Sequence, residues 1–218
     1  PLAVFTIDGR WFEHYRTEHF GFTEFKFENE DLPAAKRTDQ VIAFLDRYRQ
    51  SKREEPLFVW AHYFDPHEPY RVRSGYRGFG RSAGARYDAE IAYVDAEIGR
   101  LVNAVKQRRR RVLFVLTADH GEEFGEHGGA NHGTSVFDEQ VRVPLLFAGP
   151  GLPDREVDVP VSLTGVPATI LRLLKHRVPL SMSAGPDLTA LMDPGRRRLE
   201  GGALCETGSL RMYAPGHH

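Results

Sequence analysis

Four short apolar segments stand out along the chain, and amphipathic helical patterns lie between them. Each segment is rich in branched or aromatic residues and is apolar at successive positions, as expected for strands covered on both faces. The four predicted strands are Leu2–Thr6, Leu57–Tyr63, Val112–Thr117 and Pro144–Ala148. Because these strands alternate with helices, the pattern predicts an α/β fold with a largely parallel sheet.

Three helices are predicted from apolar positions that recur every three or four residues. The first is expected to be capped by Asp39 and to continue through Tyr48. The second, Tyr87–Gln107, is the longest and has charged residues between its apolar positions. The third, Leu163–Leu174, has Pro167 near its first turn, where a missing N–H costs little.

Composition narrows the possible partners. A net charge of −1 gives no case for a nucleic-acid partner attracted by bulk charge. The single cysteine, Cys205, excludes an internal disulfide. No stretch approaches the ~18 apolar residues that span a bilayer.

Because the chain starts at Pro1 inside a predicted strand, we expect an upstream segment to be missing. A signal there would place the protein outside the cytoplasm, in the periplasm or on a membrane anchor.

The most distinctive local feature is the turn that follows the third predicted strand. Asp119, His120 and Gly121 lie at its carboxyl end, where open α/β sheets bind ligands. A carboxylate and an imidazole in one tight turn can face the same cation. Such mixed ligands suit Mn²⁺ or Zn²⁺ and are less natural for Ca²⁺. A surface turn without a ligand is the alternative.

Three acidic residues follow this turn: Glu122, Glu123 and Glu126. We expect their side chains to be solvated; the alternative is that they lie beside the metal.

Two further histidine loops favour a catalytic site. His67 follows the second predicted strand between Pro66 and Pro69, which fix the backbone and prevent a helix there. His132 lies in a glycine-containing loop, which allows a ligand to approach the backbone closely. Packing alone hardly explains three histidine-bearing loops. We therefore expect them to converge around one pocket for an anion and a cation.

The order and spacing of these motifs resemble the sulfatase branch of the alkaline phosphatase superfamily. The resemblance covers roughly residues 55–175 and rests on Phe58–Tyr70, Tyr87–Asp95, Leu116–His127 and His132–Leu145. It implies an alkaline phosphatase-like α/β/α sandwich with a mostly parallel sheet, incomplete in this chain.

The resemblance also implies a division of the chain. Residues 1–178 would be the C-terminal portion of the catalytic domain. Residues 179–198, rich in Pro, Gly and Ser with a basic run, would be a connection. Residues 199–218 would begin a truncated small C-terminal domain, which opens with a strand at Ala203–Thr207.

Carried over position by position, the resemblance assigns roles to four residues. Asp119 and His120 resemble ligands of one divalent cation, which is Ca²⁺ by family, with Mn²⁺ or Zn²⁺ as alternatives. Many sulfatases have Asn at the position of His120. His67 resembles the histidine that contacts the ester and assists the leaving group. His132 stands where many sulfatases have a lysine that touches the anionic oxygens.

The family's nucleophile segment is not visible in the sequence. Members of the family begin with paired acidic ligands and then carry Cys or Ser in a C/S-x-P/A-x-R segment, which is oxidised to formylglycine. Asp8 has no acidic neighbour, and Cys205 is followed by Thr207 and Ser209 where Pro and Arg are required. We therefore expect an N-terminally truncated chain that by itself is nearly inactive and binds metal weakly.

The resemblance implies a metal-dependent sulfuric ester hydrolase that acts on a small-molecule or glycan sulfate ester. Two alternatives stay open. One is a phosphoester or phosphonoester hydrolase, or a phosphoethanolamine-type transferase, on the same scaffold, which His120 slightly favours. The other is a non-catalytic binding module that keeps the fold. The upstream nucleophile would decide between the first two enzymes: Cys or Ser in the formylglycine context against a plain Thr.

Overall fold

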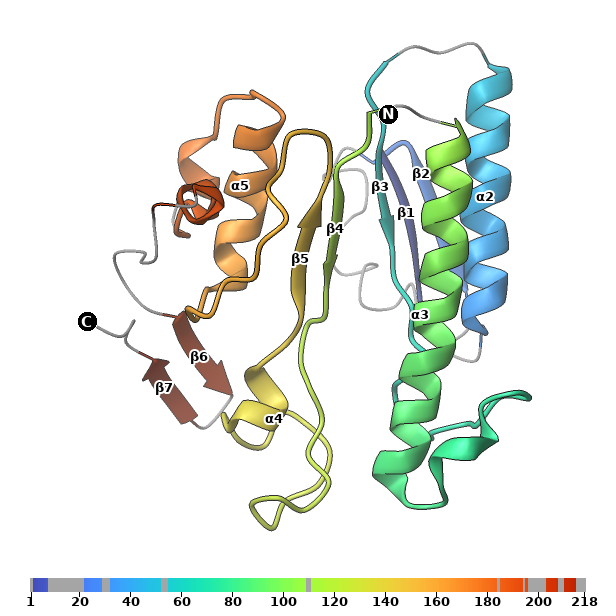
Figure 1. Cartoon of the computed structure of the whole chain (residues 1–218), viewed down its shortest axis with the longest axis vertical. Coiled ribbons are helices and arrows are strands. Elements are labelled where there is room, and N and C mark those ends of the chain that lie inside the picture. The colour runs from blue at the N-terminus through green and yellow to red at the C-terminus, as the bar shows by residue number, and fades with distance from the viewer. Residues whose placement is uncertain are drawn as a thin grey trace. The chain divides into compact units, whose positions relative to one another are not determined.

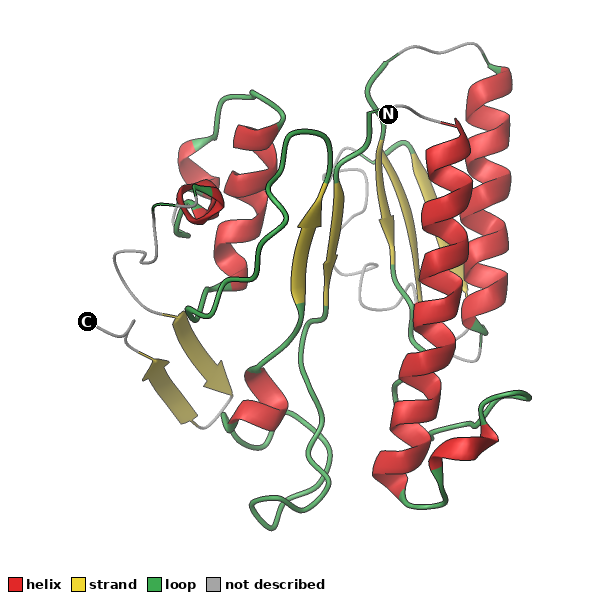
Figure 2. Cartoon of the chain, viewed as in Figure 1, coloured by secondary structure: helices red, strands yellow, loops and turns green. Residues whose placement is uncertain are grey.

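The computed structural model divides the chain into two compact units, Pro1–Val112 and Leu113–His218 (Figure 1). Both units contain helices and strands, which confirms the α/β class (Figure 2). The described residues are 2–7, 22–28, 32–51, 55–108, 111–183, 185–193, 195, 203–207 and 210–214. Asp8, considered above as a possible ligand, lies outside them.

The first unit contains a parallel three-stranded sheet in the order β2-β1-β3. Its strands are β1 (Leu2–Ile7), β2 (Glu24–Glu28) and β3 (Phe58–Ala61). β1 pairs with β2 on one side and with β3 on the other, both in parallel. This confirms the predicted parallel arrangement for these strands. β2 was not predicted.

Two long helices complete the first unit, α2 (Ala34–Gln50) and α3 (Ala83–Arg108), which run beside each other in Figure 1. The predicted apolar face of α2 is the buried one. It packs against residues of β3 and α3, and its core residues are Val41, Phe44, Leu45 and Tyr48. The periodicity therefore identified the main hydrophobic core correctly.

The predicted cap of α2 is wrong. The helix begins after Pro33, so Asp39 lies inside it, where its carboxylate accepts a hydrogen bond from Arg100 at 2.9 Å. The helical residues before Asp39 were missed because the buried ones include Arg37 and Thr38, which break an apolar pattern. α3 likewise begins one turn before the predicted start, and Ser82 Oγ accepts a hydrogen bond from Ala85 N.

The second unit contains two separate strand pairs. β4 (Phe114–Thr117) and β5 (Leu145–Ala148) are the third and fourth predicted strands, and they pair antiparallel rather than parallel. The pattern of apolar residues does not encode strand direction, so only the structure could decide it. β6 (Ala203–Thr207) and β7 (Leu210–Ala214) form the other antiparallel pair. The strand expected at Ala203–Thr207 is thus present, while the domain boundaries stay a prediction.

The helices of this unit are short. α4 spans Asp138–Val141, and α5 spans Val166–Leu173 with Pro167 in its first turn, as predicted. Short 3₁₀ helices occur in both units, at Arg77–Phe79, Leu163–Gly165, Leu180–Met182 and Leu188–Met192. None of the described helices combines the length and the apolar character needed to cross a bilayer.

Candidate functional site

The Asp119–His120 turn directly follows β4, as the sequence predicted, and it is fastened to the segment of α4. Gly121 N donates a hydrogen bond to Gln140 O at 2.7 Å. A Cβ at Gly121 would lie 2.1 Å from Glu139 O, far inside van der Waals contact. Only glycine therefore lets the turn approach the neighbouring backbone so closely.

The ring of His120 has a defined orientation. Its Nδ1 lies 2.9 Å from Gly121 O. Because a carbonyl oxygen only accepts, Nδ1 carries the proton of this bond, and Nε2 of the neutral ring keeps its lone pair. Nε2 lies 3.7 Å from Asp119 Oδ2. The turn thus presents one nitrogen and one oxygen donor close together.

This donor pair fits part of a divalent cation site. Ligand bonds of about 2.0–2.6 Å allow one cation to contact two atoms separated as these are. The Asp119 side chain is 78% exposed, which leaves space around it for further ligands. Two donors do not complete the six to eight oxygen ligands that Ca²⁺ takes, so the pair supplies only a fraction of such a site.

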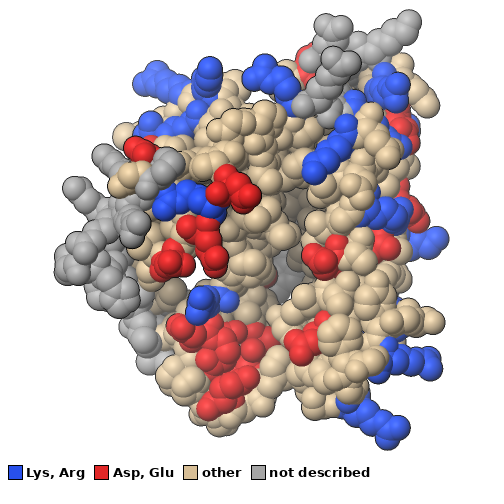
Figure 3. Space-filling model, in the orientation of Figure 1, with Lys and Arg blue, Asp and Glu red and all other residues tan. Residues whose placement is uncertain are grey.

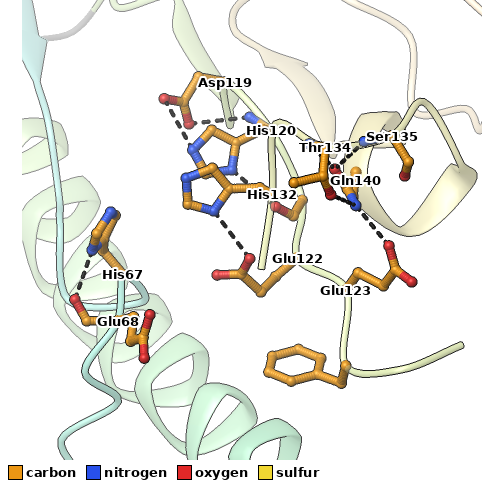
Figure 4. Close-up of polar contacts among 12 residues, drawn as sticks. His67, Glu68, Asp119, His120, Glu122, Glu123, His132, Thr134, Ser135 and Gln140 are labelled. Carbon is orange, nitrogen blue, oxygen red and sulfur yellow. Dashed lines mark hydrogen bonds and ion pairs between the residues drawn. The ribbon is translucent and has the colours of Figure 1, made fainter. Parts of the chain in front are cut away.

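His132 lies beside this turn (Figure 4). Its ring stacks on that of His120, with centroids 3.8 Å apart and planes 21° from parallel. Its Nδ1 contacts Glu122 Oε1 at 3.0 Å, and the Glu122 side chain is only 3% exposed. The structure therefore brings together three of the four residues predicted for the site.

The frame of these loops depends on Glu123 and Gln140, neither of which the sequence marked as buried. Gln140 Nε2 donates to Glu123 Oε2 at 2.7 Å, while Gly129 N and His127 N donate to Glu123 Oε1. Burial alone raises the pKa of Glu123, but these hydrogen bonds outweigh it and hold the pKa below its ordinary value. The solvated turn expected for Glu122 and Glu123 is wrong, because both side chains are buried; Glu126 is exposed as expected.

Among the described residues, one group of three offers donor atoms within 4.8 Å of one another: Glu123, His127 and Glu139. His127 Nδ1 pairs with Glu139 Oε1, and the His127 ring stacks on Phe137. Acidic side chains gather around α4 in Figure 3, in the same part of the second unit. These three side chains offer ligand atoms for a cation, but they already form hydrogen bonds with one another or with the loop. Glu123 and Glu139 are far apart in sequence, so the spacing of residues along the chain did not predict the group.

His67 belongs to the first unit. Its ring stacks on Phe64 with centroids 4.2 Å apart, and its Nδ1 lies 2.7 Å from Glu68 O. As in His120, the carbonyl acceptor places a proton on Nδ1 and makes Nε2 the lone-pair nitrogen of the neutral ring. The expectation that His67 shares a pocket with the other histidines stays a prediction.

The loop that carries His67 is anchored by buried charged groups. Glu90 of α3 accepts a hydrogen bond from Arg71 N at 2.6 Å, and Arg73 donates to Asp65 Oδ1 at 3.0 Å. Burial raises the pKa of Glu90 to about 7, and it also raises the pKa of Asp65. Among the described side chains, three buried atoms here have no hydrogen-bond partner: Asp65 Oδ2, Arg73 Nε and Glu90 Oε2.

Comparisons with known proteins identify the family of the chain. The family model described as Sulfatase matches residues 10–176. The uncharacterized sulfatase YidJ of Escherichia coli (strain K12) is 33% identical over 103 residues, which cover 47% of this chain and 20% of the relative. A sulfatase of Formosa agariphila is 36% identical over 91 residues, covering 40% and 18%. Human iduronate 2-sulfatase is 30% identical over 125 residues, covering 56% and 20%.

A solved structure from Vibrio parahaemolyticus supports the same fold. This protein of the alkaline phosphatase superfamily matches 86% of the chain with a TM-score of 0.66, and the match covers 47% of that protein at 21% identity. The fold is therefore alkaline phosphatase-like and incomplete relative to it. The chain spans about a fifth of the length of the curated relatives it matches. Since the family model matches most of the chain, the chain belongs to the sulfatase family.

Proposed function

We propose that this chain is part of a metal-dependent sulfuric ester hydrolase and carries part of its metal and substrate site. The supporting observation is the cluster in the second unit: the oxygen and nitrogen donors of Asp119 and His120, with the His132 ring stacked on His120. A cation donor pair beside a second imidazole suits a tetrahedral anion, because the anion needs both a counter-charge and hydrogen-bond donors.

Each residue has a distinct task in this proposal. Asp119 and His120 hold one divalent cation, Ca²⁺ by family, which when bound supplies a Lewis acid for a sulfate oxygen. His132 holds the anionic oxygens. His67 stabilises or protonates the leaving oxygen, which its Nε2 can do once that atom carries a proton. The nucleophile is assigned to no residue of this chain, so the isolated chain is expected to be nearly inactive.

The proposed substrate is a small-molecule or glycan sulfate ester. Among the relatives, one is named a choline-sulfatase and another a Delta 4,5-hexuronate-2-O-sulfatase, which names one small and one carbohydrate substrate. A phosphoester or phosphonoester hydrolase, or a phosphoethanolamine-type transferase, is the second candidate. His120 favours it slightly, because the resemblance gives many sulfatases Asn at that position, while phosphonate- and phosphate-cleaving relatives and some bacterial sulfatases have His.

The test compares two aryl esters, 4-nitrophenyl sulfate and 4-nitrophenyl phosphate, with the protein encoded by the complete gene and with the 218-residue chain. We expect the complete protein to hydrolyse the sulfate faster in the presence of Ca²⁺, Mn²⁺ or Zn²⁺. D119N should reduce kcat/KM at least 100-fold, and E126Q, a change at an exposed carboxylate, should leave it within about twofold. Faster phosphate hydrolysis would favour the second candidate. Rapid turnover by the isolated chain would contradict the expected inactivity.

A further inference from the structure

We propose that Glu122 is a positioning residue for His132. Its carboxylate fixes a proton on His132 Nδ1 and thereby directs Nε2 towards the oxygens of a sulfate ester. The inference rests on the proposed function for the identity of the anion, but the orientation of the ring follows from the described contacts alone.

The first observation is the burial of Glu122. Its side chain is 3% exposed, and its Oε1 lies 3.0 Å from His132 Nδ1. Burying a carboxylate is costly unless hydrogen-bond donors compensate it. The neighbouring Glu123 is also buried, but its oxygens bond to Gln140 and to loop N–H groups. The two adjacent carboxylates thus have separate tasks: Glu123 holds the loop together, and Glu122 contacts the imidazole.

The second observation is that two contacts restrain the His132 ring in different directions. The hydrogen bond to Glu122 lies at the edge of the ring and sets its rotation in the ring plane. The stack on His120 at 3.8 Å sets the plane itself. Figure 4 shows the Glu122 carboxylate directed at His132 and the two rings face to face. A ring held in both ways is pre-organised, so less entropy is lost when it contacts a substrate.

The third observation concerns the chemistry of the acceptor. An ionised carboxylate only accepts hydrogen bonds, so the proton in this contact belongs to Nδ1 in either charge state of the ring. Nε2 is the other ring nitrogen and points away from Glu122; it donates to a sulfate oxygen when the ring is the imidazolium, which carries a proton on both nitrogens. His120 keeps its own Nε2 beside Asp119, and its ring stacks on that of His132. The proposed cation ligand and the proposed anion-binding residue are therefore in direct contact.

The experiment reads the ring nitrogens of His132 directly. Long-range ¹H–¹⁵N correlation spectra of the full chain are recorded at pH 8, with His132 assigned by comparison with H132Q. We expect Nδ1 to be protonated in the parent chain and in E122Q, whose amide oxygen still accepts a hydrogen bond. E122A should lose this preference and show a mixture of the two tautomers. The matched control is E126A, which removes an exposed carboxylate four residues away that accepts a hydrogen bond from Phe124 N.

A titration with inorganic sulfate in the presence of Ca²⁺ tests the functional part. We expect sulfate to shift Nε2 of His132, with the apparent Kd about tenfold higher in E122A and within about twofold of the parent in E122Q and E126A. A parent ring protonated mainly on Nε2, or a tautomer unchanged in E122A, would overturn the inference. So would a tautomer change in E122A that leaves the sulfate Kd unaltered. Sulfate that shifts no signal of His132 in the parent would remove the proposed substrate role, while the tautomer would still decide whether Glu122 orients the ring.

Discussion

The loop that carries His67 and the loops that carry His120 and His132 hold their imidazoles with groups drawn from different distances along the chain. His67 stacks on Phe64 and bonds to Glu68, both within three residues of it. His132 bonds to Glu122, ten residues away, and stacks on His120. The first ring is therefore set by local sequence, and the second by the folding of a long loop onto itself.

The two regions also differ in the electrostatics of their anchors. Burial raises the pKa of Glu90, which anchors the His67 loop, to about 7. In the second unit, hydrogen bonds overcome burial and lower the pKa of Glu123. Glu90 therefore anchors the His67 loop less well once its carboxyl ionises, whereas Glu123 anchors the loops of the second unit as an ionised carboxylate. Variants at Gly121, Glu90, Glu123 and Asp39 test this contrast.

G121A should break the second region most severely. Its Cβ would lie 2.1 Å from Glu139 O, so the backbone must move, and we expect a loss of about 3 kcal/mol in the free energy of unfolding. G99A in α3 is the matched control, since a Cβ there meets nothing within 4 Å and alanine favours a helix by about 0.5–1 kcal/mol. Urea denaturation of both variants measures the difference. Equal stability of G121A and the parent chain would contradict the close contact.

Changing Glu90 should alter the pH dependence of stability. Its folded pKa of about 7 exceeds the ordinary value of 4.5, so the folded state binds the proton more tightly. The contribution of this group is complete below about pH 4.5 and is lost as pH rises to 7, an effect of roughly 3 kcal/mol. E90Q stays neutral and should remove this dependence, as unfolding free energies at pH 5 and pH 8 would show. Equal pH slopes for E90Q and the parent would refute the assignment.

E123A tests the second anchor with the opposite sign. It leaves the Gln140 amide and two loop N–H groups without their acceptor, so we expect Tm at pH 7 to fall by roughly 5 °C. Because the pKa of Glu123 is lowered, its contribution is present above its unfolded pKa and is lost as pH falls through the folded value. The Tm difference between E123A and the parent should therefore shrink in acid. E126A, at an exposed carboxylate, should leave Tm almost unchanged, and a difference that grows in acid would contradict the proposed anchor.

D39A should have the smallest effect on the free energy of unfolding and serves as a reference for the other variants. Asp39 lies inside α2 and makes an exposed ion pair with Arg100, which is worth about 0.5 kcal/mol or less. An N-cap residue would instead contribute ~1 kcal/mol. Urea denaturation distinguishes the two, and a loss of 1 kcal/mol or more would restore the original prediction of a cap.

Much of the local structure was determined by the sequence alone. The buried face of α2 follows from the 3–4 spacing of Val41, Phe44 and Tyr48, and β4 follows from a short apolar run before Asp119. These features depend on neighbours only a few residues away, so periodicity detects them. β2 was not predicted, although Phe25 and Phe27 alternate with charged residues in the pattern of a half-buried strand.

The tertiary structure alone decided the antiparallel pairing of β4 with β5, the place of Asp39 within a helix and the burial of Glu122 and Glu123. The sequence found Asp119, His120 and His132 as chemistry-bearing residues. It offered a place beside the metal for Glu122 and Glu123 only as the alternative to a solvated turn, and it did not indicate the Gln140 amide that bonds to Glu123. The reason is physical: whether a polar side chain is solvated or buried depends on donors supplied by residues distant in sequence. Gln140, which satisfies Glu123 from 17 residues away, reaches it only after the loop has folded.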